Sequence, residues 1–425
     1  MGRVGASVLT ERAIDVARSS PSKQLRRTEN LVKNATRIAE TLGEMKGAAM
    51  KVGQMLSLHE GMLPPEVAAV LQVLQKEAPR VPSEVMRYEV EGALGGKIDK
   101  LFADFEEEAF AAASIGQVHR GSLKDGTPVA IKIQYPLIDE IVKADLKNMK
   151  RLLQGLFGLV FDVDFEPIWE ELRDRLLEEI DYLHEAQNMH TMSELHADVP
   201  EIVIPTVIEE LSSKNVLTMR FVDGIPPSEA TSNRYPQELK NQWGRILLEF
   251  QLRGLLEHRV LHADPNLANF AFLEDGRVVV YDFGCIKRIP ERIALGYARL
   301  LRAALENRLQ DVPQVLREMG VYKKGEVALS NAILDPYVEL VADILRQDPP
   351  YVFGEDEQLY ERILELGAAN WSHSKDVQFP EDIIFIDRSL SGHFGNLIRL
   401  RASGPWRQLV DHYTRPCTPA RTAPV

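Results

Sequence analysis

Two polar side chains, Asn269 and Asp282, stand at the ends of short apolar runs, in a spacing that suits metal-assisted phosphate chemistry. Asn269 comes directly before Phe270-Ala-Phe272, and Asp282 comes directly after Val278-Val-Val-Tyr281. The segment Glu274-Asp275-Gly276 between these runs predicts the turn of a hairpin, which brings both side chains to the same open end. An amide oxygen and a carboxylate placed together form a hard-oxygen site suited to Mg²⁺ that holds nucleotide phosphates.

Asp264 lies five residues before Asn269 and is the candidate catalytic group. Its carboxylate is expected to face the same site, as a base or as the group that orients the attacking hydroxyl or water. The pair of motifs, Asp264-x₄-Asn269 and Asp282-Phe-Gly284, matches the pattern of protein-kinase-like phosphotransferases. Asp-Phe-Gly alone is a weak signal, because polar turns between core segments produce it by chance. The spacing of the two motifs therefore carries the prediction.

Lys132 ends the run Val129-Ala-Ile-Lys132, which follows the turn signal Asp125-Gly126. Strand alternation places this lysine on the face opposite the neighbouring isoleucines. In kinases the lysine of such a motif pairs with the α- and β-phosphates and with a glutamate on a helix. The acidic stretch 177–188 is the available source of that glutamate. The plainer alternatives are an exposed strand lysine and a solvated acidic helix face.

The loop that is rich in glycine in kinases reads Ala111-Ala-Ala-Ser-Ile-Gly116 in this sequence. Each alanine carries a Cβ that restricts how closely the backbone can approach a phosphate, so altered nucleotide handling is expected. Ala263 replaces the arginine that precedes the catalytic aspartate in kinases, which removes a docking site for an activation-loop phosphate. Asn266 replaces a lysine, which removes one charge that would stabilise the transferred phosphoryl group.

These features together resemble the UbiB (AarF) family of atypical protein-kinase-like proteins, which includes the mitochondrial kinases of coenzyme Q biosynthesis. The resemblance runs from about Met45 to Leu400. It also rests on Lys51-Val-Gly-Gln54, similar to the family's Lys-x-Gly-Gln signature, and on Glu179-Ile-Asp181, similar to its Glu-x-Asp motif. Phe385–Gly392 is similar to the family's C-terminal helical segment. Arg220, which stands where glutamate commonly follows methionine, departs from the family pattern.

The resemblance implies a role for each matching residue. Nucleotide binding falls to Ala111, Ala112, Ala113, Ser114, Gly116, Lys132, Glu185, Met219 and Val222, with Ala113 tuning nucleotide selectivity. Asn269 and Asp282 are the implied metal ligands, and Asp264, Lys132 and Lys51 are the implied catalytic residues. Lys51 and Gln54 are expected to regulate the site together with Glu179 and Asp181, the acids that Lys51 would reach. The implied cofactors are ATP or ADP and Mg²⁺.

The fold class expected is α+β, a protein-kinase-like two-lobe fold with an N-terminal helical extension. Amphipathic spacing from residue 28 onward predicts the extension. The predicted boundaries are a flexible leader at 1–27, the helical extension at 28–82, an N-lobe at 83–224, a helical C-lobe at 225–412 and a disordered tail at 413–425.

The preferred function is an ATP-binding, Mg²⁺-dependent atypical kinase or ATPase that supports lipid or isoprenoid-quinone metabolism. The first alternative is a nucleotide-gated scaffold that binds lipid or partner enzymes with little turnover, motivated by the missing glycine-rich loop and lysine. A sugar- or antibiotic-type phosphotransferase ranks third, because those families lack Lys-x-Gly-Gln together with the Ala-rich loop.

The composition of the 425 residues narrows the partners. The net charge of −13 disfavours nucleic acid, whose phosphates are bound by clustered Lys and Arg. No apolar run approaches the roughly 20 residues of a membrane span, and two cysteines make a disulfide framework impossible. The expected location is the cytoplasm, where the amphipathic N-terminal segment could lie on a membrane surface or pack on the kinase core. The expected ligands are a nucleotide and a lipid or quinone precursor; the oligomeric state is left open.

Overall fold

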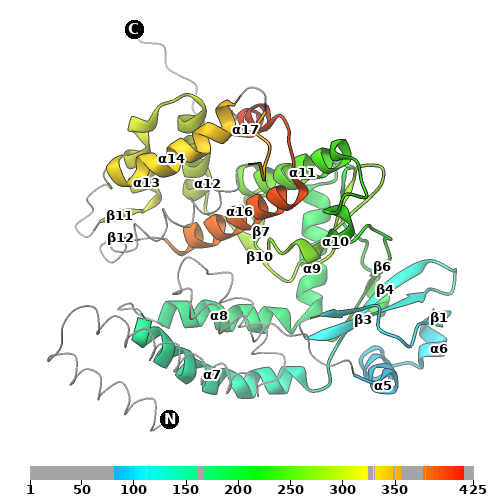
Figure 1. Cartoon of the computed structure of the whole chain (residues 1–425). Coiled ribbons are helices and arrows are strands. Elements are labelled where there is room, and N and C mark those ends of the chain that lie inside the picture. The colour runs from blue at the N-terminus through cyan, green and yellow to red at the C-terminus, as the bar shows by residue number, and fades with distance from the viewer. Residues whose placement is uncertain are drawn as a thin grey trace, which may run out of the picture. The chain divides into compact units, whose positions relative to one another are not determined.

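The computed structural model describes residues 81–113, 115–160, 166–323, 329, 331–347, 350–355, 377–378 and 380–415 (Figure 1). The predicted leader and nearly all of the predicted helical extension lie outside the described residues, with Lys51 and Gln54, and so do Ser114 and positions 416–425. The chain divides into two compact units. The first runs to Ala186 and includes Val207–Phe221, and the second contains Gln187–Thr206 and the chain from Val222 onward.

A twisted antiparallel sheet forms the centre of the first unit. Its strand order is β1-β3-β4-β6, with β2 also paired to β3. The strands are β1 (Asp104–Phe105), β2 (Ala111–Ala113), β3 (Gly116–Ser122), β4 (Pro128–Gln134) and β6 (Val216–Arg220). The predicted strand around Lys132 is confirmed as β4. The run Val216–Val222 also predicts a strand, and the structure has β6 there, ending two residues earlier at Arg220.

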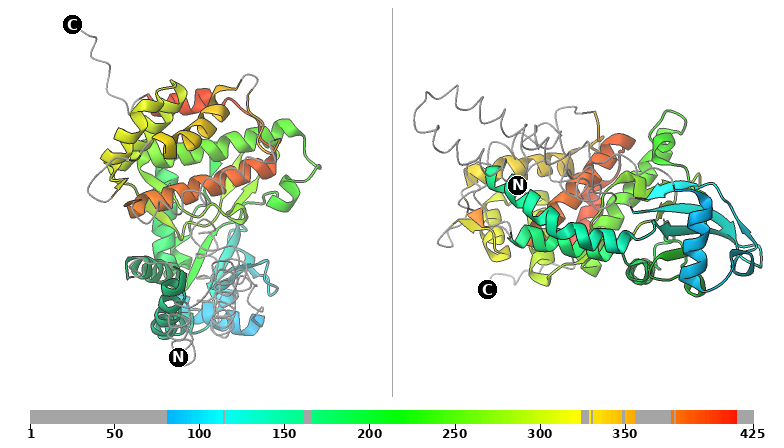
Figure 2. Two further views of the ribbon diagram at one scale, coloured as in Figure 1. Left: turned by 60° about the vertical axis from the view of Figure 1, so that its left-hand side comes forward. Right: turned by 90° about the horizontal axis from the view of Figure 1, so that it is seen from below.

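One face of this sheet is covered by the helix α5 (Ser83–Leu94) (Figure 2). Val129, Ile131 and Ile133 of β4 are fully buried on this face, where they pack with Met86 and Val90 of α5. Because side chains alternate along a strand, Lys132 points to the opposite face, as predicted. Burial of the β-branched residues thus fixes which way the lysine faces.

Helices follow β4, where the sequence predicts helical structure from Leu137 to about Leu195. The structure has α7 (Ile138–Val160), α8 (Glu166–Glu179) and α9 (Tyr182–Leu195). Asp181 separates α8 from α9, and its Oδ1 accepts hydrogen bonds from the backbone N–H groups of Leu183 and His184 at 3.0 and 3.4 Å. A carboxylate in this position satisfies the unpaired N–H groups of a helix start, so Asp181 begins α9.

Short strands and helices make up the second unit. The predicted hairpin is confirmed: β8 (Phe270–Phe272) pairs antiparallel with β9 (Val278–Val280), and β5 (Ile202–Val203) adds in parallel beside β9. A separate ladder joins β7 (Val260–His262) to β10 (Ile286–Arg288). From Val222 onward, the described α-helices are α10 (Pro227–Ala230), α11 (Gln237–Leu252), α12 (Glu291–Leu305), α13 (Val312–Met319), α14 (Asn331–Arg346), α16 (Glu381–Leu400) and α17 (Trp406–Thr414).

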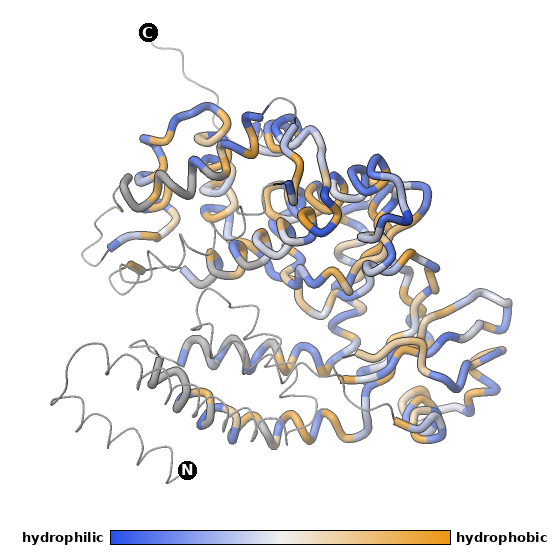
Figure 3. Tube along the Cα trace, in the orientation of Figure 1, coloured by the Kyte–Doolittle hydropathy of each residue, from blue (hydrophilic) through white to orange (hydrophobic). Residues whose placement is uncertain are grey.

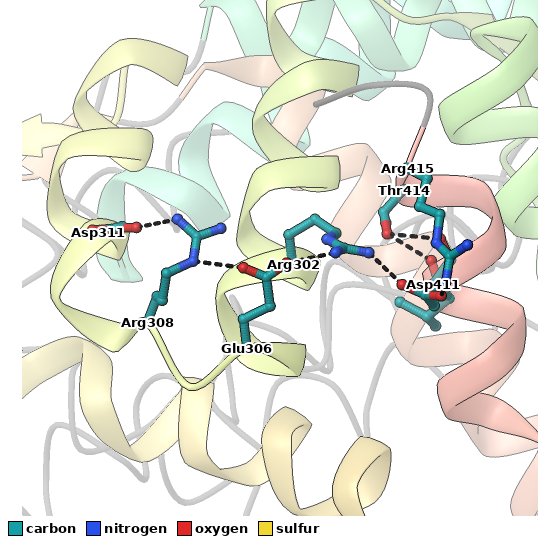
Figure 4. Close-up of polar contacts among 8 residues, drawn as sticks. Arg302, Glu306, Arg308, Asp311, Asp411, Thr414 and Arg415 are labelled. Carbon is teal, nitrogen blue, oxygen red and sulfur yellow. Dashed lines mark hydrogen bonds and ion pairs between the residues drawn. The ribbon is translucent and has the colours of Figure 1, made fainter. Parts of the chain in front are cut away.

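These helices are amphipathic, as the alternating hydropathy along α12 and α16 illustrates (Figure 3). An ion-pair network fastens α17 to α12 (Figure 4). Arg302 of α12 contacts both Glu306 and Asp411, and Asp411 also binds Arg415. The helix α17 ends at Thr414, two residues beyond the predicted end of the C-lobe at 412. No helix in the described part of the chain is both long and apolar enough to span a bilayer.

Candidate functional site

A buried ion pair joins the strand lysine to α9. Lys132 Nζ lies 2.8 and 2.9 Å from the two carboxylate oxygens of Glu185, and only 12% and 4% of the two side chains are exposed. The ammonium also lies over the ring of Tyr182, 4.9 Å from its centroid. Lys132 lies within a central strand, and Glu185 lies in the first turn of α9. The helix dipole favours a negative charge at this end of a helix. Within the acidic stretch 177–188, Glu185 is therefore the carboxylate that pairs with Lys132.

The Ala-rich turn lies beside this pair on the same sheet. Ala111, Ala112 and Ala113 form β2, which pairs with β3 in the register Ala113↔Gly116. A Cβ added to Gly116 would come within 2.2 Å of the Ile133 carbonyl oxygen and 3.1 Å of the Tyr182 hydroxyl. Only glycine allows this close approach of β3 to β4. Gly116 is therefore required by the packing of the turn.

In the second unit, the segment that contains Asp264 is fixed by local hydrogen bonds. The Asp264 Oδ1 accepts the backbone N–H of Asn266 at 3.1 Å, and Asn266 Oδ1 accepts that of Ala268 at 3.1 Å. Asn269 Nδ2 lies 3.5 Å from the Asp264 carbonyl oxygen. These side-chain turns hold Asp264 and Asn269 in one compact loop between β7 and β8.

Asp282 lies at the same end of the β8–β9 hairpin as Asn269. The backbone N–H of Tyr281 donates to the Asn269 carbonyl at 2.9 Å, which extends the hairpin pairing to the residue before Asp282. Asp282 Oδ1 accepts the Gly284 N–H at 3.0 Å, and its backbone carbonyl lies 2.6 Å from His262 Nε2. His262 is buried, so β7 and the Asp282 turn are locked together. Among the described residues, no three His, Cys, Asp or Glu side chains gather as a metal site; the prediction here is one carboxylate and one amide.

Comparison with known proteins places this arrangement in a family. Residues 73–316 match the model of the ABC1 atypical kinase-like domain. The chain belongs to the ABC1 family. It is 34% identical to the atypical kinase COQ8B, mitochondrial, of Rattus norvegicus, and 30% identical to the atypical kinase coq-8, mitochondrial, of Caenorhabditis elegans. These alignments cover 92% and 89% of this chain, and 74% and 51% of the relatives.

A solved structure supports the fold as well. The complex of Rv3197 with erythromycin from Mycobacterium tuberculosis superimposes with a TM-score of 0.66 at 28% identity, over 91% of this chain and 97% of the other. The α+β kinase-like fold that the motifs predict is therefore confirmed. The ABC1 homology also confirms the predicted resemblance to the UbiB family.

Within this ABC1 chain, α16 supports the Asp264 loop through contacts that the motif spacing did not predict. Ser389 Oγ donates to the His262 carbonyl at 3.0 Å, and Asn396 Nδ2 donates to the Pro265 carbonyl at 2.8 Å. Gly392 lies between them, and a Cβ there would come within 2.2 Å of the Pro265 ring. Ser389, Gly392 and Asn396 recur at three- and four-residue steps, so they share one helical face. In the sequence, the available signal for these contacts was a polar residue, Ser389, within the otherwise apolar face of Phe385–Gly392.

A second residue that sequence reasoning missed lies on α9. Asn188 is buried, and its Nδ2 donates to the carbonyl of Phe283 in the Asp-Phe-Gly turn at 2.9 Å. Asn188 follows Glu185 by three residues along α9.

The remaining predicted residues are placed as follows. Met219 of β6 is buried, and it pairs in register with Ala130 of β4. The carbonyl of Val222 accepts the Tyr281 hydroxyl at 2.8 Å. Burial and the nearby Asp223 carboxylate raise the pKa of Tyr281 to about 12, so this donor stays protonated. Glu179 is half-buried at the end of α8, and Asp181 caps α9.

Proposed function

We propose that this chain is an atypical kinase or ATPase that binds ATP with Mg²⁺ and acts in, or supports, lipid or isoprenoid-quinone metabolism. The observation that carries the proposal is the Lys132–Glu185 pair. Burying two charges costs free energy that their attraction often fails to recover, so such a pair is poorly explained by stability alone. A glutamate that holds a lysine in one orientation is well suited to presenting an ammonium to nucleotide phosphates.

The metal chemistry would fall to Asn269 and Asp282. Their donor set fits Mg²⁺, which prefers hard oxygens and is usually held by one or two protein groups together with substrate phosphates. The Asn269 amide nitrogen is directed to the Asp264 carbonyl, which leaves its side-chain oxygen as the atom to offer a cation. Bound Mg²⁺ would neutralise phosphate charge during transfer.

The purine base would contact the segment after β6. Because the Val222 carbonyl is engaged by Tyr281, we propose that the Val222 N–H is the backbone group that contacts the base. Met219, which is buried, and Ala130, which is partly buried, would line the apolar side of the base site. ADP would use the same contacts.

Asp264 would orient the attacking group. Its Oδ1 is held by the Asn266 N–H, so the carboxylate is preorganised and reorganises little when a hydroxyl or water arrives. Asn266 offers no cation to the transferred phosphoryl, and its side-chain oxygen is used to cap the short helix Leu267–Asn269. Transfer is therefore expected to be slower than in kinases that keep a lysine there.

The presence of Asn266 in place of a lysine favours a second candidate, a nucleotide-gated scaffold. A site that holds the nucleotide but lacks one charge stabiliser can bind tightly and turn over little. Binding of nucleotide would then bias a partner or lipid interaction.

The acceptor class rests on the relatives. Two of them are named as mitochondrial kinases of the COQ8 type, and the solved neighbour is a complex with erythromycin. We propose a hydrophobic organic acceptor or ligand, such as a lipid or quinone precursor. We propose a cytoplasmic location, with peripheral contact to a membrane surface as the open alternative.

Conversion of ATP to ADP in the presence of Mg²⁺ tests this proposal, because hydrolysis and transfer to an acceptor both form ADP. The reactions are run with the protein alone, with liposomes, with a quinone-like phenol and with erythromycin. Asp264→Asn removes the catalytic carboxylate, and Glu274→Gln, an exposed acid in the β8–β9 turn, is the matched control.

Steady turnover that Asp264→Asn abolishes and Glu274→Gln preserves supports the enzyme. Tight nucleotide binding without turnover under every condition supports the scaffold and refutes the enzyme. A protein that binds no nucleotide refutes both.

A further inference from the structure

Arg120 of β3 lies between two aromatic rings in the first unit. Its guanidinium carbon is 3.9 Å from the centroid of Phe110 and 4.6 Å from that of Phe221. The two rings also meet edge to face, with centroids 5.8 Å apart. We call Arg120, Phe110 and Phe221 the Arg120 clasp. A cation held over ring faces is attracted by their negative quadrupole.

Strand register places the clasp next to the proposed nucleotide-binding face. Arg120 pairs with Ala130, and Ala130 pairs with Met219, one strand further. The next row of paired residues on the same face, two positions further along each strand, contains Lys132. Paired residues share a face, so Arg120 lies on the Lys132 side of the sheet, about 7 Å along the strand direction.

The two rings come from opposite edges of this face. Phe110 precedes β2, and its N–H donates to the Val118 carbonyl at 2.8 Å. Phe221 follows β6, and its N–H donates to the Pro128 carbonyl at 3.0 Å. The clasp therefore ties the entry to the Ala-rich turn to the segment that leads to Val222.

The guanidinium of Arg120 contacts aromatic rings, and its buried Nε makes no hydrogen bond to the described residues. Phe110 remains 50% exposed although its ring contacts Arg120 and Phe221. The three alanines of β2 have little side chain to bury, so this short edge strand depends on contacts at its ends.

We propose that Arg120 is a positioning residue for nucleotide binding. The clasp orders β2 and holds the Ala-rich turn in place against the Ala130–Met219 row, which would line the base site. This inference rests on the proposed function, since it assigns Arg120 a part in the affinity of that site. Losing the cation would let β2 open and would weaken nucleotide affinity.

Two readouts on the full-length chain test the inference. The first is the Kd of ADP with Mg²⁺ from equilibrium dialysis, and the second is hydrogen exchange at the backbone amides of Ala111–Ala113 without nucleotide. Arg120→Ala should raise the Kd about fivefold and speed the exchange. Arg120→Lys keeps the cation and should restore most of both. Arg220→Ala, an exposed arginine on the adjacent strand β6, is the matched control and should change neither.

Arg120→Ala that binds and exchanges like Arg220→Ala overturns the inference. Faster exchange without loss of affinity also overturns it, because the clasp would then be purely structural. If the wild type binds no nucleotide, the proposed function fails, and with it the role of Arg120 in affinity; ordering of β2 is then decided by exchange alone.

Discussion

Asn188 donates its side-chain N–H to the Phe283 carbonyl at 2.9 Å, from a position that is 5% exposed. The bond ties α9 to the Asp-Phe-Gly turn, directly beside the carboxylate of Asp282. His262 holds the same turn from the other direction through the Asp282 carbonyl. The backbone on both sides of the Asp282 side chain is therefore fixed before any ligand binds.

Replacing Asn188 by alanine should destabilise the protein and loosen this turn. The substitution leaves the Phe283 carbonyl buried without its donor, which typically costs about 1–3 kcal/mol. Denaturant unfolding measures this loss. Gln187→Ala alters an exposed neighbour on the same helix and should stay within about 0.5 kcal/mol of wild type. Equal effects of the two variants would contradict the role assigned to Asn188.

The Lys132–Glu185 pair should show strong coupling in a double-mutant cycle. Lys132→Met strands a buried carboxylate and should cost about 3 kcal/mol of unfolding free energy. The double variant Lys132→Met with Glu185→Leu should be more stable than the sum of the single losses predicts, because no charge remains buried. Additive losses in chemical denaturation would show that the pair is not a coupled unit.

The α16 face that supports the Asp264 loop can be tested with two glycines on one helix. A methyl group at Gly392 would clash with Pro265, whereas nothing lies within 4 Å of a Cβ at Gly395. Gly392→Ala should therefore destabilise by about 1–3 kcal/mol, and Gly395→Ala should be neutral or stabilising by up to about 1 kcal/mol from helix propensity. Thermal unfolding of both variants decides the matter. Similar melting temperatures would refute the close packing of α16 on this loop.

Stability should fall as the pH drops from about 6.5 to about 4. His196 is 3% exposed, and burial lowers its pKa from 6.5 to about 4. Within this window the unfolded chain binds a proton that the folded ring does not, so acid favours unfolding, and the loss levels off below pH 4. The contribution is of order 3 kcal/mol.

His196→Leu should flatten this part of the pH profile of unfolding free energy, although the buried His393, whose pKa is lowered to about 3, keeps some of the slope. His184→Leu removes an exposed ring of α9 and is the control. An unchanged slope in His196→Leu would contradict this assignment.

Local patterns predicted much of the fold and of the site. Strand alternation placed Lys132 opposite the isoleucines, and the hairpin between Asn269 and Asp282 follows from a turn signal between two apolar runs. Both are short-range features that the sequence determines directly. The end of α8 and the start of α9 follow from the capping by Asp181, which a continuous helical pattern conceals.

The supporting contacts could not be predicted, because they join distant parts of the chain. Asn396 and Pro265 are 131 residues apart, and Asn188 and Phe283 are 95 apart. Periodicity shows that α16 has an apolar face but not which loop packs on it. Arg120 reads as an ordinary strand cation, since its two aromatic partners, Phe110 before β2 and Phe221 after β6, are not its neighbours in the sequence.

The most direct test of the central claim is nucleotide-dependent thermal stabilisation with and without Mg²⁺, for wild type, Asp282→Asn and Asp275→Asn. Asp275 is an exposed acid at the other end of the same hairpin. At a nucleotide concentration of about 100 times the Kd, binding should add about 2.7 kcal/mol to the wild type. Asp282→Asn should lose the part that depends on Mg²⁺, while Asp275→Asn should keep it. No stabilisation of the wild type at millimolar nucleotide would contradict the account.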